Sequence, residues 1–508
     1  LASAGDPATA IRHARAHSRL LREKVGIDPP PELTKFVREL RASGVSDDLR
    51  SVAVLPFVNV GGDPETEFFS DGVTYDIINR LAKIGGLKVV SGTSTARYRN
   101  TTKSIGTIGA ELGAAAILEG EIQRDGNRVR INAQLIDART DEHLWAEQYD
   151  RKLDFVFAIQ SDVARQVAAG LRATLTTAER QRIDREPTRK IEAYNLYLRG
   201  RSHWVRRGAG LKTALEYFRQ ALQVDPEYAL AHVGVADCHA LFGWFAEMPP
   251  SHAFSEAKTA ALRALEINPE LAEALATLGF VHALHEWRLL DAETELQRAV
   301  AIEPGYAPAH YYQSPIFLMT GRPDEAVNST RRALELDPLS PFVNAHLGWM
   351  LIGAGRFKEA IRQLERAVEL DPALSMAHWL IGWARLEESG PESAIPYLER
   401  AVEQSGRTPW FLAHLGRAYG LTGRPESEDV LEELATQRTV RYVRPICDVL
   451  VHLGRGETSR ALDWLEKAWD ERDPWLAFLK IDPAFDAVRA EPRFVDLAER
   501  IEARRTGS

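Results

Sequence analysis

The sequence is poor in cysteine and has no long apolar run. Its 508 residues include two cysteines, Cys238 and Cys447, which lie far apart in the chain. Two cysteines cannot build a disulfide framework, and their scarcity is typical of a reducing compartment. No apolar run reaches the length of a membrane span, and no secretory signal opens the chain. We therefore predict a cytoplasmic protein with no membrane segment.

Signatures of catalysis are also missing from the sequence. It contains no G-x-x-x-x-G-K-[ST] phosphate loop, no H-E-x-x-H, no G-x-S-x-G and no paired C-x-x-C. The nearest approaches to a metal site are Asp237-Cys238-His239 and the pair His282 and His285, and neither has a further histidine or cysteine at i+4. We therefore predict no catalytic residue, no metal ion and no cofactor, and we expect that the chain is not an enzyme.

Neither sign of charge dominates the composition. The net charge is −9 and the pI is about 5.9, so the chain as a whole has no electrostatic footprint for nucleic acid. An apolar content of 45% with 27% charged residues is ordinary for a globular protein. The length predicts three or more domains.

A repeat of about 34 residues dominates the second half of the chain. The marker Leu-Asp-Pro ends at Pro338 and again at Pro372, and a related marker ends at Pro304, 34 residues before Pro338. Earlier markers end at Pro269 and Pro226, and an insertion near residues 244–250 lengthens the spacing between those two. A sustained period of this length predicts a solenoid of helix pairs.

Small residues recur at fixed places within each unit. In the unit that ends at Pro372, Gly348 and Ala360 are expected where the paired helices cross, and Ala367 where the next unit packs. Gly355 is expected to end the first helix.

This pattern resembles the tetratricopeptide repeat (TPR). The resemblance implies about eight helix pairs over residues 190–476, followed by a C-terminal helical cap over residues 477–508. In the seventh unit Glu428 stands where alanine is expected, so the packing of that unit is open to question.

Residues 51–185 have a different pattern, which predicts an α/β domain with a mixed sheet. Asp125-Gly126 predicts a tight hairpin turn. The strings V-A-V-L-P-F, I-L-E-G-E-I and Q-L-I-D-A-R-T-D-E-H-L-W resemble the TolB amino-terminal-like (FlgO-related) domain. The expected strands cover residues 51–57, 87–90, 115–122, 129–135 and 143–150, and the expected helices cover residues 68–81, 105–112 and 155–175.

Two groups of residues in this domain are candidate ligand sites. Gly106, Gly109 and Gly113 recur in one segment, where helix packing and capping explain them better than phosphate binding. Asp71-Gly72 and Tyr75-Asp76 form an acidic cluster, for which helix capping and polar surface are the default interpretation.

Residues 1–45 predict two helices separated by the break at residues 25–31. The string L-L-R-E-K-V-G-I-D-P-P-P-E-L resembles the C-terminal end of the bacterial transcriptional activator domain (BTAD), which usually follows a winged-helix DNA-binding domain. Because the chain begins at Leu1 without methionine, we expect a fragment. The predicted fold is thus multidomain α + α/β: an N-terminal helical fragment, a mixed-sheet α/β domain and an α-solenoid.

The strongest candidate site is the inner face of the solenoid. In TPR proteins the first helix of each pair lines a concave groove, and an aromatic, apolar groove favours a protein or peptide partner. The same stripe of residues could instead pack inside the solenoid or against the α/β domain, and both interpretations stay open here. Aligned on Gly348, the resemblance implies these groove residues: Tyr311, Phe342, Trp349, Met376, Trp379, Trp383 and Trp410.

The order of the segments predicts the sensory and protein-interaction portion of a bacterial transcriptional regulator. The TPRs would bind a protein or peptide partner or self-associate, and DNA would be bound only by a missing upstream domain. The alternative is the regulatory tail of a signalling enzyme, a protein kinase or nucleotide cyclase, whose catalytic domain lies outside this chain.

Overall fold

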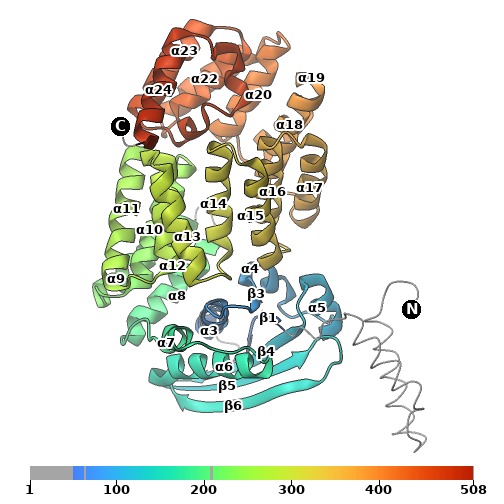
Figure 1. The fold of residues 1–508 in the computed structure, drawn as a ribbon, viewed down its shortest axis with the longest axis vertical. Helices are drawn as coiled ribbons and strands as arrows, with labels where there is room; N and C mark the ends of the chain where they lie inside the picture. Colours follow the sequence, from blue (N-terminus) through green and yellow to red (C-terminus); the bar gives the residue numbers. More distant parts are fainter. Residues whose placement is uncertain (1–49, 62–63, 206–209, 507–508) are drawn as a thin grey trace, which may run out of the picture. The chain divides into compact units, whose positions relative to one another are not determined.

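The computed structural model of the chain describes residues 50–61, 64–205 and 210–506 (Figure 1). The chain divides into two compact units, residues 1–184 and 185–508, and each is described by itself. The helices predicted within residues 1–45 lie outside the described residues.

The first unit is built on a six-stranded mixed sheet with the strand order β3-β1-β4-β5-β6, in which the short strand β2 also pairs with β4. Strand β1 is parallel to β3 and β4, whereas β5 and β6 continue the sheet antiparallel. The predicted mixed sheet is confirmed, and β2 is an addition to it. The strands are β1 (Ser51–Val54), β2 (Val58–Asn59), β3 (Lys88–Val90), β4 (Ala116–Asp125), β5 (Arg128–Asp137) and β6 (His143–Lys152).

The β4–β5 hairpin shows how the sequence sets the register. Gly126 takes a φ of +55° in the turn, and Asp125 pairs with Arg128 across it. Because side chains alternate between the faces of a strand, one face of β5 is buried and the other is solvated. Val129, Ile131, Ala133 and Leu135 are the buried set, as the alternation predicts.

Helices cover the sheet of this unit. α3 and α6 pack against each other, and Figure 1 shows α6 lying over β5 and β6. The prediction that α6 continues to residue 175 is wrong, because Arg172 takes a φ of +55° and ends the helical path. Two helices were not predicted, α4 and α7. The helical elements are α3 (Pro64–Ala82), α4 (Gly92–Thr95), η3 (Ala96–Tyr98), α5 (Ile105–Leu112), η4 (Leu153–Phe155), α6 (Val156–Gly170) and α7 (Thr177–Asp184).

The second unit is an array of eight helix pairs in its described residues, which confirms the predicted solenoid. The first helices of the pairs are α8 (Ile191–Val205), α10 (Ala229–Trp244), α12 (Ala272–Val281), α14 (Ala307–Met319), α16 (Pro341–Gly353), α18 (Ser375–Ser389), α20 (Pro409–Leu421) and α22 (Pro445–Gly454). The second helices are α9 (Gly210–Val224), α11 (Pro250–Ile267), α13 (Leu289–Ile302), α15 (Pro323–Leu336), α17 (Phe357–Leu370), α19 (Pro391–Gln404), α21 (Glu426–Arg438) and α23 (Thr458–Asp470).

Close contact between paired helices explains the small residues of the repeat. A Cβ atom placed on Gly348 would lie 2.5 Å from the side chain of Leu364, so α16 and α17 meet at this point. Ala360 and Ala367 are fully buried. Gly355 has a φ of +71°, the left-handed conformation that ends α16.

The seventh pair departs from the pattern by one residue. Ser427, not Glu428, is the small buried residue of α21, while Glu428 is exposed and forms an ion pair with Arg455. Helix α20 instead meets α22 at backbone distance. A Cβ atom on Gly420 would lie 2.6 Å from the carbonyl carbon of Gly454.

Two short 3₁₀ elements and a helix follow the last pair: η6 (Pro474–Phe478), η7 (Pro483–Val488) and α24 (Pro492–Thr506). They return to the third pair, where η6 contacts the π-helical turn η5 (His282–Glu286) and α24 contacts α13. Trp287 stacks on Trp469 with ring centroids 5.1 Å apart, and the guanidinium of Arg504 lies over both rings. The array therefore closes on itself. Among the described residues, no helix combines the length and apolar character needed to cross a membrane.

Candidate partner-binding site

The seven predicted groove residues lie on the first helices of four consecutive pairs, from α14 to α20. The structure divides them into two contacting groups and one outlier. Trp349, Trp379, Trp383 and Trp410 form the first group, Tyr311 and Phe342 form the second, and Met376 is half-buried at the edge of the core.

The four tryptophans of the first group surround Trp475, a residue of η6. Trp475 is only 1% exposed. Its ring centroid lies 4.6 Å from Trp410 and 5.9 Å from Trp349, on which it stacks at 14°. Trp383 and Trp379 follow at 6.2 Å and 6.3 Å. The chain's own C-terminal segment thus occupies the face on which the predicted residues lie.

Two further aromatic residues complete this cage around Trp475. Phe478 lies 4.9 Å from Trp475, and Trp244 of α10 lies 6.2 Å from it. Sequence reasoning did not place Trp475 in the site. The available signal was the triplet Asp473-Pro474-Trp475 directly after the last pair, which repeats the Asp-Pro marker and adds an aromatic residue.

A buried ion pair anchors the start of this segment. Arg444, at the beginning of α22, donates from Nε to Oδ2 of Asp473 over 3.0 Å, and its Nη2 pairs with Oδ1. Burial opposes the charge of the guanidinium, but the neighbouring Asp473 carboxylate outweighs it and the pKa of Arg444 is raised. Arg444 also lies over the ring of Trp410, 4.9 Å from its centroid. This arrangement recognises a carboxylate beside an aromatic surface.

The two aspartates of the segment shape its backbone. Asp473 accepts a hydrogen bond from the backbone amide of Trp475, and Asp482 accepts one from the amide of Ala484. In each case a proline follows the aspartate and begins a 3₁₀ turn. Asp482 also accepts a hydrogen bond from Nε1 of Trp475 over 2.8 Å, and burial raises the pKa of this carboxyl.

Not every polar group of the cage is satisfied by the segment. Nε1 of Trp379 and Nε2 of His414 are buried and have no hydrogen-bond partner. The two rings are 5.1 Å apart. Burial lowers the pKa of His414 well below its usual value, so its ring is neutral. An unpaired buried polar group typically costs about 1–3 kcal/mol, so the segment is an imperfect occupant of this face.

The second group of predicted residues lies beside His346. Tyr311 is 5.4 Å from Phe342 and 5.6 Å from His346. His346 forms a hydrogen bond with Oγ of Ser314 and touches Trp349 edge-on at 5.3 Å, so it links the two groups. Burial lowers the pKa of His346 to about 4.

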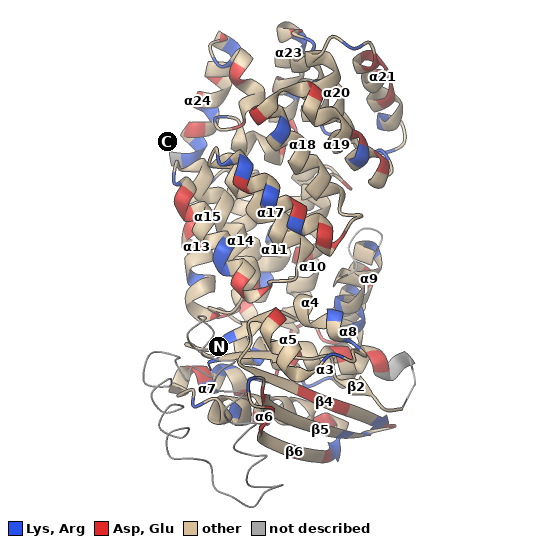
Figure 2. Ribbon diagram, turned by 90° about the vertical axis from the view of Figure 1, so that its right-hand side faces the viewer, with Lys and Arg blue, Asp and Glu red and all other residues tan. Residues whose placement is uncertain are grey.

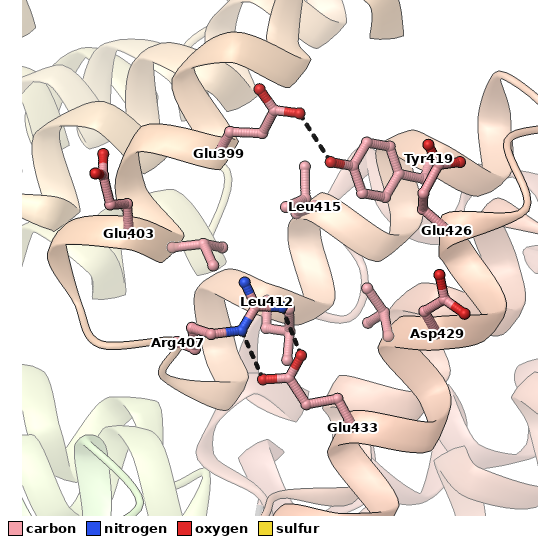
Figure 3. Close-up of a pocket in the computed structure, with 11 residues that line it drawn as sticks. Glu399, Glu403, Arg407, Leu412, Leu415, Tyr419, Glu426, Asp429 and Glu433 are labelled. Carbon is pink, nitrogen blue, oxygen red and sulfur yellow. Dashed lines mark hydrogen bonds and ion pairs between the residues drawn. The ribbon is translucent and has the colours of Figure 1, made fainter.

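A separate acidic pocket of about 520 Å³ lies between α19, α20 and α21 (Figure 3). Figure 2 marks in red the acidic residues along α21. Arg407 forms an ion pair with Glu433, and the hydroxyl of Tyr419 donates to Glu399. The pocket contains none of the seven predicted residues. It is lined by Glu399, Val402, Glu403, Arg407, Leu412, Leu415, Tyr419, Glu426, Asp429, Val430 and Glu433.

The candidate ligand sites of the α/β domain have structural partners. Asp71 forms an ion pair with Arg99, and Asp76 accepts a hydrogen bond from Gln160. A Cβ atom on Gly109 would lie 2.4 Å from that of Ala138, so this glycine permits close packing of α5.

Two of the residues considered as metal ligands, Asp237 and His282, have partners within the fold. Asp237 accepts a hydrogen bond from Thr277, and His282 lies 3.7 Å from Glu286. Within the described ranges, no three His, Cys, Asp or Glu side chains gather as metal ligands would.

Two family models match separate parts of the chain. Residues 48–165 match the second domain of HilA/YgeH-like transcriptional regulators. Residues 256–426 match the tetratricopeptide repeat. The chain therefore carries a HilA/YgeH-like regulator domain and TPRs. The match to a TPR model agrees with the predicted repeat.

Each of two named relatives matches a longer part of the chain than either family model does. The protein named "Putative adenylate cyclase 3" of Rhizobium meliloti (strain 1021) is 40% identical over 215 residues, which cover 42% of this chain and 34% of the relative. The transcriptional regulator HilA of Salmonella typhimurium (strain LT2) is 23% identical over 298 residues, 57% of this chain and 51% of HilA. The chain thus spans between a third and a half of these relatives.

Among solved structures, a thermophilic TPR protein of Thermus thermophilus is 22% identical. It superposes with a TM-score of 0.33, and the match covers 38% of this chain and 99% of that protein.

Proposed function

We propose that this chain is the sensory and protein-interaction portion of a bacterial transcriptional regulator, without catalytic activity of its own. One observation carries the proposal. The similarity to HilA covers 298 residues, which is longer than the first unit of residues 1–184, so it must include part of the repeat array. Residues 48–165 separately match the second domain of HilA/YgeH-like transcriptional regulators, so the likeness to regulators of this kind involves both parts of the chain.

The finer assignments rest on sequence resemblance. Residues 1–45 resemble the end of a bacterial transcriptional activator domain, and residues 51–185 resemble the TolB amino-terminal-like domain. In such an arrangement an upstream domain binds DNA in the cytoplasm, the α/β domain senses or transmits, and the repeats recruit a partner. Solenoids of helix pairs offer extended concave surfaces for this purpose.

The partner-binding site that we propose is the face formed by the seven predicted residues, with the four tryptophans at its centre. Tryptophan and tyrosine dominate binding energy at protein interfaces because they bury large areas with few rotatable bonds. Arg444, beside Trp410, would add recognition of a carboxylate. The partner is accordingly a peptide segment with aromatic and acidic side chains.

The similarity to the cyclase supports a second candidate. At 40% identity over 215 residues it is the stronger of the two in identity, but it covers only 34% of the cyclase. Under this alternative the chain is the regulatory tail of a signalling enzyme that makes a cyclic nucleotide elsewhere in the molecule. Purified chain incubated with ATP should form no cyclic AMP under either candidate.

Transcript profiling of a deletion strain, with cyclic AMP measured in parallel, separates the candidates. Deletion of the gene should change a defined set of transcripts, and an allele with Trp383→Ala should reproduce much of that change. An allele with Leu290→Ala, which alters a side chain that is 75% exposed, is the matched control. Unchanged transcripts would contradict the proposal, and a fall in cyclic AMP would favour the enzyme tail.

A further inference from the structure

The C-terminal segment of residues 473–488 covers the face of the four tryptophans in the way a bound peptide would. Three consecutive residues place it there. The Asp473 carboxylate pairs with Arg444, Pro474 begins the turn, and Trp475 enters the tryptophan cage. The same pattern returns at Asp482-Pro483, followed by Phe485, which is also fully buried. The segment thus displays the chemistry that this face binds.

The segment differs in its secondary structure from the repeats that precede it. It consists of short 3₁₀ turns, not a ninth helix pair. It also leaves Nε1 of Trp379 and Nε2 of His414 without hydrogen-bond partners in the buried cage. A segment from another protein that meets these two groups would satisfy the face better than the chain's own.

We propose that residues 473–488 are an intramolecular occupant of the partner site, displaced by a partner segment that presents an acidic residue, a proline and an aromatic residue. The chain is then autoinhibited until such a segment arrives. This proposal rests on the proposed function, because it names the partner chemistry and the regulation of the same face. Charge complementarity commits it to an acidic segment, since Arg444 is buried and cannot turn to solvent.

A synthetic peptide of residues 470–488 with a fluorescent label tests the proposal by anisotropy. The full chain with Trp475→Ala should bind the peptide at least tenfold more tightly than the unaltered chain, because its own segment is loosened. Peptides that carry Asp473→Ala or Trp475→Ala should bind at least tenfold more weakly. The chain with Leu290→Ala is the control and should behave like the unaltered chain.

Circular dichroism and urea unfolding show whether the Trp475→Ala chain is folded. A folded Trp475→Ala chain that does not bind the peptide would overturn the proposal and make the segment a fixed cap. If that variant does not fold, Asp473→Asn replaces it, since it removes the carboxylate charge that pairs with Arg444 but keeps Trp475. A dimer formed by exchange of the segment between two copies would also overturn it.

The two proposals fail separately. Peptide binding is measured on purified protein, whereas the proposed function is measured on transcripts. Transcripts that depend on Trp383 without any peptide binding would leave the regulator intact and remove the autoinhibition. Peptide binding without any change of transcripts would support the autoinhibition and contradict the proposed role as a regulator.

Discussion

Trp475 contacts all four tryptophans of the predicted site. The ring centroids of four tryptophans, Phe478 and Trp244 lie within 6.3 Å of its own, and its indole nitrogen donates to Asp482. Replacement of a fully buried large aromatic residue by alanine usually costs about 3–5 kcal/mol. We expect Trp475→Ala to lower the free energy of unfolding of the repeat unit by that amount in urea titrations. Leu290→Ala, the exposed control, should stay within about 0.5 kcal/mol, and an equally small effect of Trp475→Ala would contradict the cage.

The ion pair of Arg444 and Asp473 gives a second prediction at this scale. Arg444→Met leaves the Asp473 carboxylate buried without its partner, which typically costs about 3–5 kcal/mol. In the double variant Arg444→Met/Asp473→Asn the buried charge is gone, while the asparagine oxygen still accepts from the amide of Trp475. The double variant should therefore be more stable than Arg444→Met alone. Urea midpoints of both variants and of Asp473→Asn form the test, and additive losses would refute the coupling.

The resemblance to the TPR predicted one shared face for Trp349, Trp379, Trp383 and Trp410, and their role in partner binding stays a prediction. The structure brings these four side chains around Trp475, a contact that the sequence did not indicate. Trp475 follows the last pair and belongs to no period. Its position depends on where the whole array returns, which no local pattern contains.

At the scale of elements, Gly420 of α20 and Gly454 of α22 determine how these two helices meet. A Cβ atom on Gly420 would lie 2.6 Å from backbone of α22, whereas one on Gly382 would meet the flexible side chain of Leu398 at 2.8 Å. Both substitutions to alanine gain about the same helix propensity, near 1 kcal/mol. Gly420→Ala must separate two helix backbones and should therefore cost about 1–3 kcal/mol more than Gly382→Ala. Thermal unfolding of the two variants tests this prediction. Equal stabilities would contradict the close approach of the α20 and α22 backbones.

Element boundaries followed the sequence where proline or glycine marks them. Pro341 and Pro409 stand at the start of their helices, and Gly355 ends one in the left-handed conformation. The prediction failed where an ordinary residue takes that conformation, as Arg172 does after α6. At α21, where the sequence left the packing open, Ser427 lies inward and Glu428 is exposed.

At the scale of the whole repeat unit, buried histidines make stability depend on pH. Burial lowers the pKa of His239, His285 and His346 to about 4, and it lowers those of His282, His310 and His414 as well. In the unfolded chain these rings titrate near about 6.5. Between the two values the unfolded state binds more protons, so stability is lost as pH falls from about 6.5 towards 4.

Each such histidine contributes up to about 1.4 kcal/mol per pH unit to the slope. Burial raises the pKa values of Asp448 and Asp482, and these two groups act in the opposite direction, so the net slope is smaller than the sum. Urea unfolding at pH values of about 7, 6 and 5 should show falling midpoints. His346→Gln should flatten the slope, whereas Leu290→Ala, which changes an exposed residue of the same unit that does not titrate, should not. Midpoints that rise towards the acid end would contradict the assignment.

Closure of the array is a property of the molecule that its repeats do not specify individually. Each pair adds a small rotation, and the sum decides whether the last helices meet the third pair, as Trp469 meets Trp287. The sequence therefore predicted a solenoid and an aromatic inner stripe, and left open whether a partner or the chain itself covers that stripe. In the structure the chain covers it.

Hydrogen exchange in the unaltered chain tests most directly whether this cover is exchangeable. Amides of residues 473–488 are followed with and without a saturating, isotope-labelled peptide of residues 470–488, while α14 to α22 serve as the internal reference. Faster exchange of residues 473–488 in the presence of the peptide, with α14 to α22 still protected, is the predicted result. Unchanged exchange at saturation would show that the segment is a permanent part of the core and would contradict the autoinhibited site.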